Sequence, residues 1–159
     1  MLRFTHGNLL EARVDAIVNT VNTVGVMGKG LALQVKAAFP AVDAAYRDAC
    51  ERGEVRIGHM HVVPMPTLQP RFVINFPTKE HWRNPSRLEY VTSGLKDLVR
   101  VVAELGIRSI AVPPLGCGSG GLDWDTVKGE ITSALGTLEG VDVVVFEPTP
   151  RSRLTQPKP

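Results

Sequence analysis

The sequence predicts an α/β protein with three layers (α/β/α), in which helices cover both faces of a mixed, mostly parallel sheet. Short apolar runs typical of buried strands alternate along the chain with longer stretches of helical periodicity. Two glycine-rich loops each lead directly into a predicted helix. The chain has 159 residues, of which 43% are hydrophobic, which is enough for one domain with a substantial core.

The N-terminal half contains two predicted strands followed by two predicted helices. Residues 2–5 form a short strand, and residues 16–19 form a compact apolar run that is typical of a buried strand. Residues 31–39 carry apolar side chains near helical spacing, and a proline follows them directly. Residues 41–52 predict a second helix, which ends at a glycine in a likely position for a C-terminal cap.

The middle of the chain contains a weak strand and a strong one. Residues 59–63 alternate weakly, and this strand would place His59 and His61 on one face. Two histidines fall short of the three protein ligands that a zinc site needs, so we expect no metal site. Residues 71–76 form a strong strand that we expect to end at Pro77.

The C-terminal half alternates helix and strand. Residues 86–89 fit a capping box, which opens an amphipathic helix over residues 88–105. Residues 109–112 and 141–146 predict buried strands, and residues 123–138 predict the helix between them.

We divide the chain into a domain over residues 1–148 and a basic, proline-containing tail or linker over residues 149–159. The two cysteines show neither a disulfide framework nor metal spacing, which fits a reducing cytoplasm. The apolar runs are too short to span a bilayer, so no membrane association is expected. A formal net charge of +2 neither requires nor excludes a nucleic-acid partner.

A loop dense in glycine, residues 113–123, connects the strand at 109–112 to the next helix. Backbone N–H groups of such a loop, together with a helix N-terminus, suit an anion such as phosphate. The sequence of this loop matches the motif G-x-G-x-x-G. However, two prolines separate the loop from the strand, and only one more strand follows, which disfavours a dinucleotide-binding unit. A plain connection with turn glycines is the alternative.

A second glycine-rich loop, residues 25–30, follows Asn19 and Asn22 at the end of the strand that begins at Ala16. It lacks the Gly-Lys-Ser/Thr ending of a P-loop. Ligands of open α/β sheets gather at the carboxyl ends of strands, so two such loops could hold a diphosphate from both sides.

In the order and spacing of these landmarks the chain resembles a macrodomain, the ADP-ribose-binding fold, from residue 2 to about residue 148. Residues 75–79 and 115–124 resemble the branch of terminal ADP-ribose glycohydrolases, in particular the DarG-type antitoxins. The resemblance implies a DNA ADP-ribosyl glycohydrolase that removes ADP-ribose from thymidine bases of single-stranded DNA and counteracts a DarT-type toxin. The toxin would be bound through a second domain absent from this chain, and no cofactor is implied.

The resemblance and the loop physics together assign the ADP-ribose site. Its expected residues are Asn8, Leu9, Asn19, Asn22, Met27, Gly28, Lys29, Gly30, Thr78, Gly116, Cys117, Gly118, Ser119, Gly120, Gly121, Leu122 and Phe146. Asn8 stands where macrodomains commonly have an aspartate that accepts from the adenine amino group, and Phe146 could stack on adenine. Gly120 stands where protein-directed relatives have a catalytic aspartate, which favours the DNA-directed branch.

Lys79 and Asn22 are the expected catalytic residues. Asn22 would orient the distal ribose, unless it only caps a turn. Lys79 would attack the anomeric carbon as a neutral amine, or would stabilise the departing base as a cation. A surface lysine beside Glu80 is the alternative.

Basic residues interleaved with an aromatic residue follow Lys79 and suit single-stranded DNA: His81, Trp82, Arg83 and Arg87. A packed tryptophan with solvated arginines is the alternative. Two other activities stay open for the whole pocket, a non-catalytic ADP-ribose-binding module and a hydrolase of protein or small-molecule ADP-ribose esters. A nicotinamide dehydrogenase would need an acid–base residue that the sequence does not offer.

Overall fold

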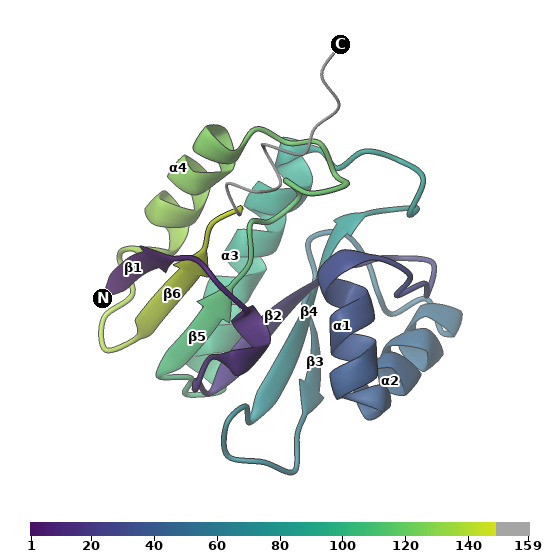
Figure 1. Ribbon diagram of the computed structural model, residues 1–159, viewed down its shortest axis with the longest axis horizontal. Coiled ribbons are helices and arrows are strands. Elements are labelled where there is room, and N and C mark those ends of the chain that lie inside the picture. The colour runs from purple at the N-terminus through teal and green to yellow at the C-terminus, as the bar shows by residue number, and fades with distance from the viewer. Residues whose placement is uncertain (149–159) are drawn as a thin grey trace.

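The computed structural model describes residues 1–148, which form one six-stranded sheet between two layers of helices (Figure 1). The strands are β1 (Leu2–Thr5), β2 (Ala16–Asn22), β3 (His61–Pro64), β4 (Phe72–Lys79), β5 (Ser109–Val112) and β6 (Asp142–Phe146). Their spatial order is β1-β6-β5-β2-β4-β3. Every neighbouring pair is parallel except β3 and β4, so the expected mixed, mostly parallel sheet is confirmed.

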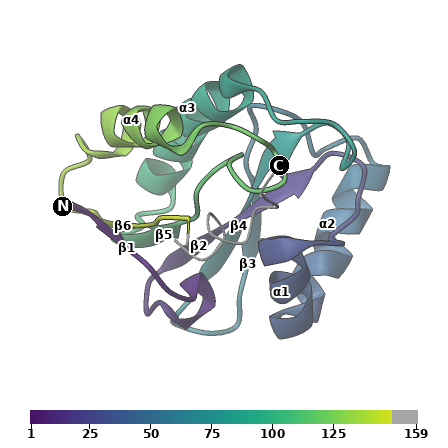
Figure 2. The same ribbon diagram turned by 45° about the horizontal axis from the view of Figure 1, so that its top comes forward.

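Helices cover both faces of this sheet (Figure 2). The helices are α1 (Gly30–Ala38), α2 (Pro40–Glu51), α3 (Leu88–Glu104) and α4 (Trp124–Leu135). The pair α1 and α2 lies on one face and the pair α3 and α4 on the other, and a short 3-10 helix, Leu9–Glu11, follows β1. Parallel strands need such crossover helices, which explains the three layers.

Side chains of the central strands point alternately into hydrophobic cores on the two faces of the sheet. In β2, Val18 belongs to the core beneath α3 and α4, whereas its neighbour Ile17 belongs to a core on the opposite face. Both side chains are fully buried, because a strand in the middle of a covered sheet has no solvent-facing side. On the face toward α3, the backbone of Gly94 lies directly against the ring of Phe76.

Three expectations about element ends are wrong. The strand at Ala16 continues to Asn22, and the strand at Phe72 runs through Pro77 to Lys79. Pro77 is tolerated because β3 pairs with β4 only up to Asn75, so Pro77 has a strand neighbour on one side only. The first histidine of the expected pair, His59, precedes β3.

The expected capping box is also absent, since Arg87 occupies the N-cap of α3 without a side-chain hydrogen bond. Ser86 instead donates a hydrogen bond to the carbonyl oxygen of Thr78. The serine therefore fastens the segment before α3 to the end of β4.

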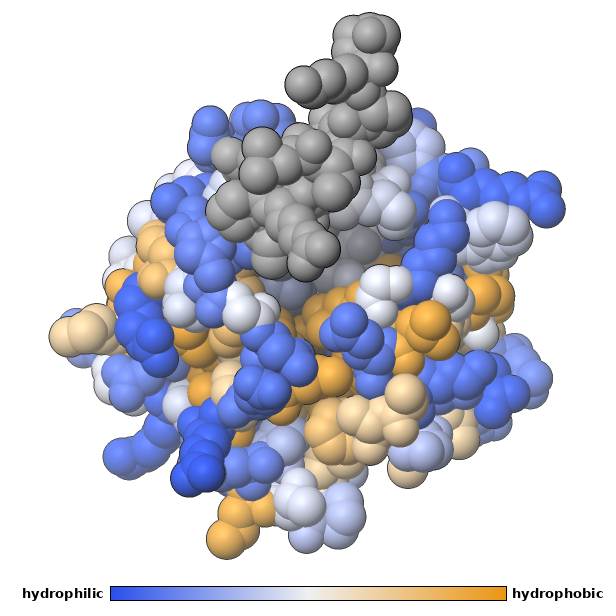
Figure 3. All heavy atoms as spheres, viewed as in Figure 1, coloured by the Kyte–Doolittle hydropathy of each residue, from blue (hydrophilic) through white to orange (hydrophobic). Residues whose placement is uncertain are grey.

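Within residues 1–148, no helix is long and apolar enough to cross a membrane, and no three metal-binding side chains come together. The predicted tail, residues 149–159, lies outside the described part of the chain. On the face shown in Figure 3, hydrophobic residues gather in a band near the middle, between hydrophilic ones. Apolar atoms contribute much of the surface of most folded proteins, so this band alone indicates no function.

Candidate active site

A cavity of about 570 Å³ opens where β2, β4 and β5 end. These three strands are adjacent and parallel, so their carboxyl ends lie at the same edge of the sheet. The lining residues come from the last residues of β2 and β4, from the loops that follow β2, β4 and β5, and from the first turn of α1: Thr20, Val21, Asn22, Val26, Gly28, Lys29, Gly30, Leu31, Ala32, Thr78, Lys79, Trp82, Pro113, Pro114, Gly116, Gly118, Ser119 and Gly120.

The topology explains why the cavity lies here. The chain leaves β2 toward α1 on one face of the sheet, and leaves β5 toward α4 on the opposite face. Loops that diverge to opposite faces leave a crevice between them, and ligands of open α/β sheets bind in such crevices. Both glycine-rich loops recognised in the sequence border this crevice.

A bulge brings Asn22 and Lys79 to the floor of the cavity side by side. Val21 pairs with Pro77, but Asn22 pairs with Lys79, so Thr78 is an extra residue on β4. Its carbonyl oxygen accepts a hydrogen bond of 2.6 Å from the Ser86 hydroxyl. Bulges often re-aim side chains next to active sites, and this one places Lys79 beside Asn22 on the neighbouring strand.

The Lys79 amine lies between two of the loops. Nζ donates to the Ser119 hydroxyl at 3.0 Å and to the Trp82 carbonyl oxygen at 3.3 Å. Partial burial lowers the pKa of Lys79, and the nearby Lys29 ammonium lowers this pKa further. Both effects favour the neutral amine, which is the nucleophilic form of lysine.

The Asn22 side chain organises the loop that follows β2. Its Oδ1 atom accepts from the backbone N–H groups of Val24 at 3.0 Å and Gly25 at 3.2 Å, and Nδ2 donates to the Val26 carbonyl oxygen at 2.8 Å. The turn-capping role considered for Asn22 is therefore present in the structure. Contact with a ribose stays a prediction, and it is compatible with this role because Asn22 also lines the cavity.

The glycine loop is held tightly against Ser86. The Ser86 backbone N–H donates to the Gly120 carbonyl oxygen at 2.9 Å. A Cβ atom on Gly120 would overlap the Gly116 carbonyl oxygen and approach Cβ of Ser86 to 2.9 Å. Gly116 itself has φ of 73°, a region that favours glycine. No side chain fits at position 120 in this conformation, so no carboxylate can act from there.

The structure brings together ten of the predicted ADP-ribose and catalytic residues around the cavity: Asn22, Gly28, Lys29, Gly30, Thr78, Lys79, Gly116, Gly118, Ser119 and Gly120. The other predicted residues do not line it. Leu9, Met27 and Phe146 are buried apolar side chains. Gly121 has φ of 79°, and Leu122 packs against the core beneath α3 and α4.

Two predicted polar residues that do not line the cavity, Asn8 and Asn19, have structural partners of their own, and a third, Cys117, is partly buried. Asn8 accepts from the Leu10 N–H and caps the short 3-10 helix. Asn19 is fully buried, and its Nδ2 atom donates to Asn75 Oδ1 at 3.0 Å. Burial raises the pKa of Cys117 to about 12, which leaves the thiol protonated and a poor nucleophile.

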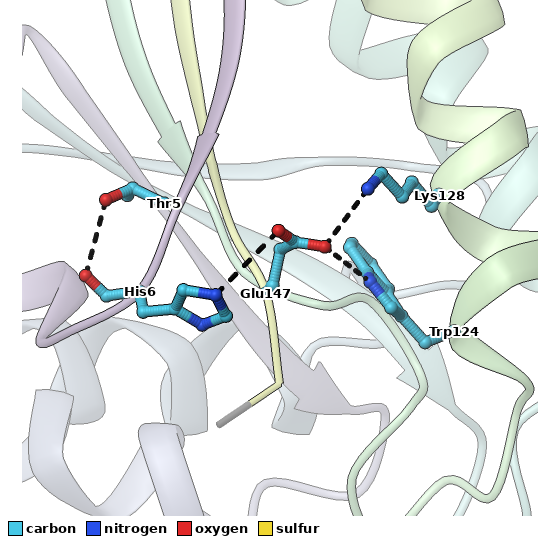
Figure 4. A network of polar contacts seen from close by, with 5 residues as sticks. All are labelled: Thr5, His6, Trp124, Lys128 and Glu147. Atoms are coloured by element: carbon cyan, nitrogen blue, oxygen red, sulfur yellow. Dashed lines mark hydrogen bonds and ion pairs between the residues drawn. The ribbon is translucent and has the colours of Figure 1, made fainter. Parts of the chain in front are cut away.

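Glu147, the residue after Phe146, belongs to a network of polar contacts that joins three segments (Figure 4). The Glu147 carboxylate accepts from Trp124 Nε1 at 3.0 Å and from Lys128 Nζ at 3.1 Å. Its other oxygen lies 3.9 Å from His6 Nε2. The network therefore ties the chain after β6 to the start of α4 and to the turn after β1.

Three of the four predicted DNA-binding residues, His81, Trp82 and Arg83, form a stack at the rim of the cavity. Trp82 is 40% exposed, and the centroid of its ring lies 5.1 Å from the centroid of the His81 ring. The Arg83 guanidinium lies 4.8 Å from the centroid of the Trp82 ring. Trp82 also lines the cavity. Arg87 is exposed at the start of α3, 3.9 Å from Glu89. The Trp82 ring and the Arg83 guanidinium are thus exposed in the segment that directly follows Lys79.

Two residues that shape this site carry no recognisable signal in the sequence. Ser86 was interpreted as a helix cap, although it holds the bulge and the glycine loop. Tyr46 is an apolar-face position of α2, and periodicity alone does not reveal that its hydroxyl reaches Asn22.

Comparison of the sequence with known proteins gives consistent matches. The profile of the Macro domain family matches residues 18–131. The DNA ADP-ribosyl glycohydrolase of Thermus aquaticus is 64% identical over 149 residues, which cover 93% of this chain and 41% of that protein. Its namesake from Mycobacterium tuberculosis is 54% identical over 154 residues, which cover 96% of this chain and 44% of that protein. The chain therefore spans less than half the length of these curated relatives.

The chain is also similar in structure to solved proteins of the same kind. The macrodomain of Thermus aquaticus DarG superposes with a TM-score of 0.90 at 64% identity, covering 93% of this chain and 99% of that one. Thermosipho africanus DarTG in complex with ADP-ribose superposes with a TM-score of 0.86 at 35% identity, covering 96% of this chain and 44% of that one.

Proposed function

This chain belongs to the macrodomain family, and we propose that it is a DNA ADP-ribosyl glycohydrolase that removes ADP-ribose from thymidine bases of single-stranded DNA. The observation that carries the proposal is the Lys79 amine, which lies in the cavity beside Asn22 with a lowered pKa. Gly120 leaves no room for a catalytic carboxylate at that position, which supports a mechanism that depends on the lysine. The names of the relatives, which share 64% and 54% identity with this chain, support the same reaction.

ADP-ribose would lie along the cavity between the two glycine-rich loops. Backbone N–H groups of residues 28–30 and 116–121 would hold the diphosphate, with Lys29 adding positive charge. With this placement the distal ribose would lie over Asn22 and Lys79. A relative solved in complex with ADP-ribose superposes on this chain with a TM-score of 0.86, which supports the choice of ligand.

In the reaction we propose, the bond between the anomeric carbon and the ring oxygen breaks, the oxygen takes up a proton to become a hydroxyl, and the neutral Lys79 amine adds to the anomeric carbon. The carbon–nitrogen bond to thymine then breaks, thymine leaves with the bonding electrons and takes up a proton, and an imine remains on Lys79. Water adds to the imine and breaks the bond to lysine, which releases ADP-ribose. In a second version Lys79 stays protonated and stabilises the departing base electrostatically.

Substitution of Lys79 tests the function. The substrate is an oligonucleotide carrying ADP-ribosyl-thymidine, and release of ADP-ribose is followed over time. Lys79→Ala is expected to reduce the rate by at least about 100-fold while ADP-ribose binding persists, because the amine acts on the bond and not on the diphosphate. Release by Lys79→Ala near the wild-type rate would contradict the assignment.

The same assay separates the two versions of the reaction. Arginine keeps the positive charge but cannot form an imine, so Lys79→Arg is inactive if the amine is a nucleophile. Borohydride added during turnover would then trap ADP-ribose covalently on the wild-type protein. Substantial activity in Lys79→Arg, with no trapped adduct, favours the electrostatic version.

The stack of His81, Trp82 and Arg83 would bind the DNA strand beside the modified base. Aromatic rings accept stacked bases, and exposed arginines contact phosphates. Arg83→Ala is expected to weaken binding of modified oligonucleotides and to reduce the slope of log affinity against log salt by about 0.7. Affinity for free ADP-ribose should not change, since that ligand has no flanking phosphates.

The same experiments can also reveal either of two alternative functions. Tight ADP-ribose binding with modified DNA left intact would indicate a non-catalytic binding module. Cleavage of an ADP-ribosyl-glutamate peptide, in a parallel reaction, would indicate a hydrolase of protein esters.

We also propose a DarT-type DNA ADP-ribosyl transferase as the functional partner, acting with this protein in the cytoplasm. A relative from Thermosipho africanus, 36% identical over 163 residues, is named as a fusion of a DNA ADP-ribosyl transferase with a DNA ADP-ribosyl glycohydrolase. Co-expression in bacteria tests the pairing: the wild type should relieve growth arrest by such a transferase, and Lys79→Ala should not.

A further inference from the structure

Tyr46 connects α2 to the floor of the cavity. Its ring is fully buried, and its hydroxyl lies 2.7 Å from Asn22 Oδ1 and 2.8 Å from the Asn22 carbonyl oxygen. A phenolic hydroxyl has one proton, so it donates to one of these oxygens or is shared between both. In either case a fully buried hydroxyl holds Asn22.

The contact is the shortest that the Asn22 amide makes. The backbone donors to Oδ1 lie at 3.0, 3.2 and 3.4 Å, and they belong to the loop after β2. Tyr46, in contrast, belongs to a helix that packs in the core. The hydroxyl therefore links the amide to a helix of the core, whereas the other donors to Oδ1 are backbone groups of the loop.

The bonds to Oδ1 determine how the amide is turned. Asn22 Nδ2 carries two N–H groups, of which one donates to Val26, and the other has no protein partner among residues 1–148. Asn22 lines the cavity next to Lys79 in the strand register. An amide held in this way offers a ligand in the cavity a donor of fixed direction.

We propose that Tyr46 is a positioning residue for the hydrolysis: its buried hydroxyl orients the Asn22 amide so that the distal ribose is presented to Lys79. This inference rests on the proposed function. Burial also raises the pKa of the Tyr46 hydroxyl, so the hydroxyl remains a donor throughout the pH range of an enzyme assay.

Tyr46→Phe tests the proposal, because it removes the hydroxyl and keeps the buried ring. With ADP-ribosyl-thymidine oligonucleotide as substrate, kcat should fall roughly 3- to 10-fold, the range expected for loss of one orienting hydrogen bond. KM and the affinity for free ADP-ribose should change less than about 2-fold, since the diphosphate loops are untouched. An effect confined to KM, or a kcat equal to that of the wild type, overturns the proposal.

A double-mutant cycle shows whether Tyr46 acts through Asn22. If it does, Tyr46→Phe lowers kcat by less than about 2-fold in a protein that already carries Asn22→Ala. Full additivity of the two substitutions overturns the proposal.

Cys50→Ala is the matched control. Cys50 lies beside the Tyr46 hydroxyl and does not line the cavity. The kcat of Cys50→Ala should equal that of the wild type. A loss of kcat as large as that of Tyr46→Phe would indicate that any change in this part of the core disturbs the site, and it overturns the proposal. Thermal unfolding of each variant fixes an assay temperature at which all are folded.

Failure of the two proposals can be distinguished. A wild-type protein that releases no ADP-ribose overturns the proposed function and the role of Tyr46 with it. An active wild type beside an equally active Tyr46→Phe overturns the role of Tyr46 alone.

Discussion

At the scale of single residues, the site depends on how two lysines share one cavity. Lys29 and Lys79 both line it, and the positive charge of Lys29 contributes to the lowered pKa of Lys79. Lys29 would also attract the diphosphate of the ligand. The residue thus has two separable effects, one on binding and one on protonation.

Replacing Lys29 by glutamine should move the pH profile. Without its neighbour the pKa of Lys79 rises, so a smaller fraction of the amine is neutral at a given pH. If the neutral amine is the nucleophile, the pH at which kcat reaches half its maximum should increase, while kcat at high pH is retained. The measurement is kcat between pH 6 and 10 at saturating substrate.

A shift to lower pH in Lys29→Gln would contradict this coupling. Arg87→Gln is a suitable control, since Arg87 is another exposed cation and lies outside the cavity. It should leave the kcat profile in place.

Some residues of the site can be predicted from the sequence, but their contacts cannot. The lysine could be recognised because it follows a strong strand, at the edge where ligands bind in α/β proteins. Its neighbours Ser119 and Trp82 are 40 and 3 positions away, and periodicity carries no information about such contacts. Tyr46 and Ser86 were missed for the same reason, because long-range hydrogen bonds leave no local pattern.

At the scale of elements, α3 is fitted closely to the sheet at one point. Gly94 is buried in the middle of the helix, and a Cβ atom there would overlap the Phe76 ring. Glycine normally weakens a helix relative to alanine. At this position the close approach of helix and strand outweighs that preference.

Gly94→Ala should therefore destabilise the protein, by about 1–3 kcal/mol, because the new methyl group forces Phe76 or the helix to move. Gly129→Ala is the matched control in α4, where a Cβ atom would meet no atom within 4 Å. It should stabilise by about 0.5–1 kcal/mol, as alanine does in a helix interior. Urea unfolding of both variants measures the two free energies, and a stabilised Gly94→Ala would refute the overlap.

Most elements could be predicted, and their ends could not. Alternating strands and helices follow from the periodicity of apolar residues, and all six strands and four helices were expected near their observed positions. The continuation of β4 through Pro77 was missed, because proline usually ends a strand. Only the sheet order reveals that Pro77 has a neighbour on one side only.

At the scale of the whole molecule, Glu147 connects segments that are far apart in the sequence. Its carboxylate joins the chain after β6 to Trp124 and Lys128 at the start of α4, and faces His6 after β1 (Figure 4). The pKa of Glu147 is lowered, first by the hydrogen bond from Trp124 and then by that from Lys128. The charged form is thus the one that the fold stabilises.

Glu147→Gln should lower the stability of the protein by about 1 kcal/mol, since the amide loses the ionic part of both contacts. For a domain of this size the thermal midpoint should drop by roughly 2–6 °C. Glu139→Gln, at an exposed position, is the control and should leave the midpoint unchanged. Equal midpoints for wild type and Glu147→Gln would show that the network adds nothing to stability.

The crowding at Gly120 has a consequence for anyone who wishes to redesign this pocket. Grafting an aspartate at position 120, to imitate a protein-directed hydrolase, would displace the backbone before it supplied an acid, because the Gly116 carbonyl oxygen and Ser86 already occupy the space. A change of substrate class along this route would have to begin with remodelling of the loop, and the new carboxylate would come second.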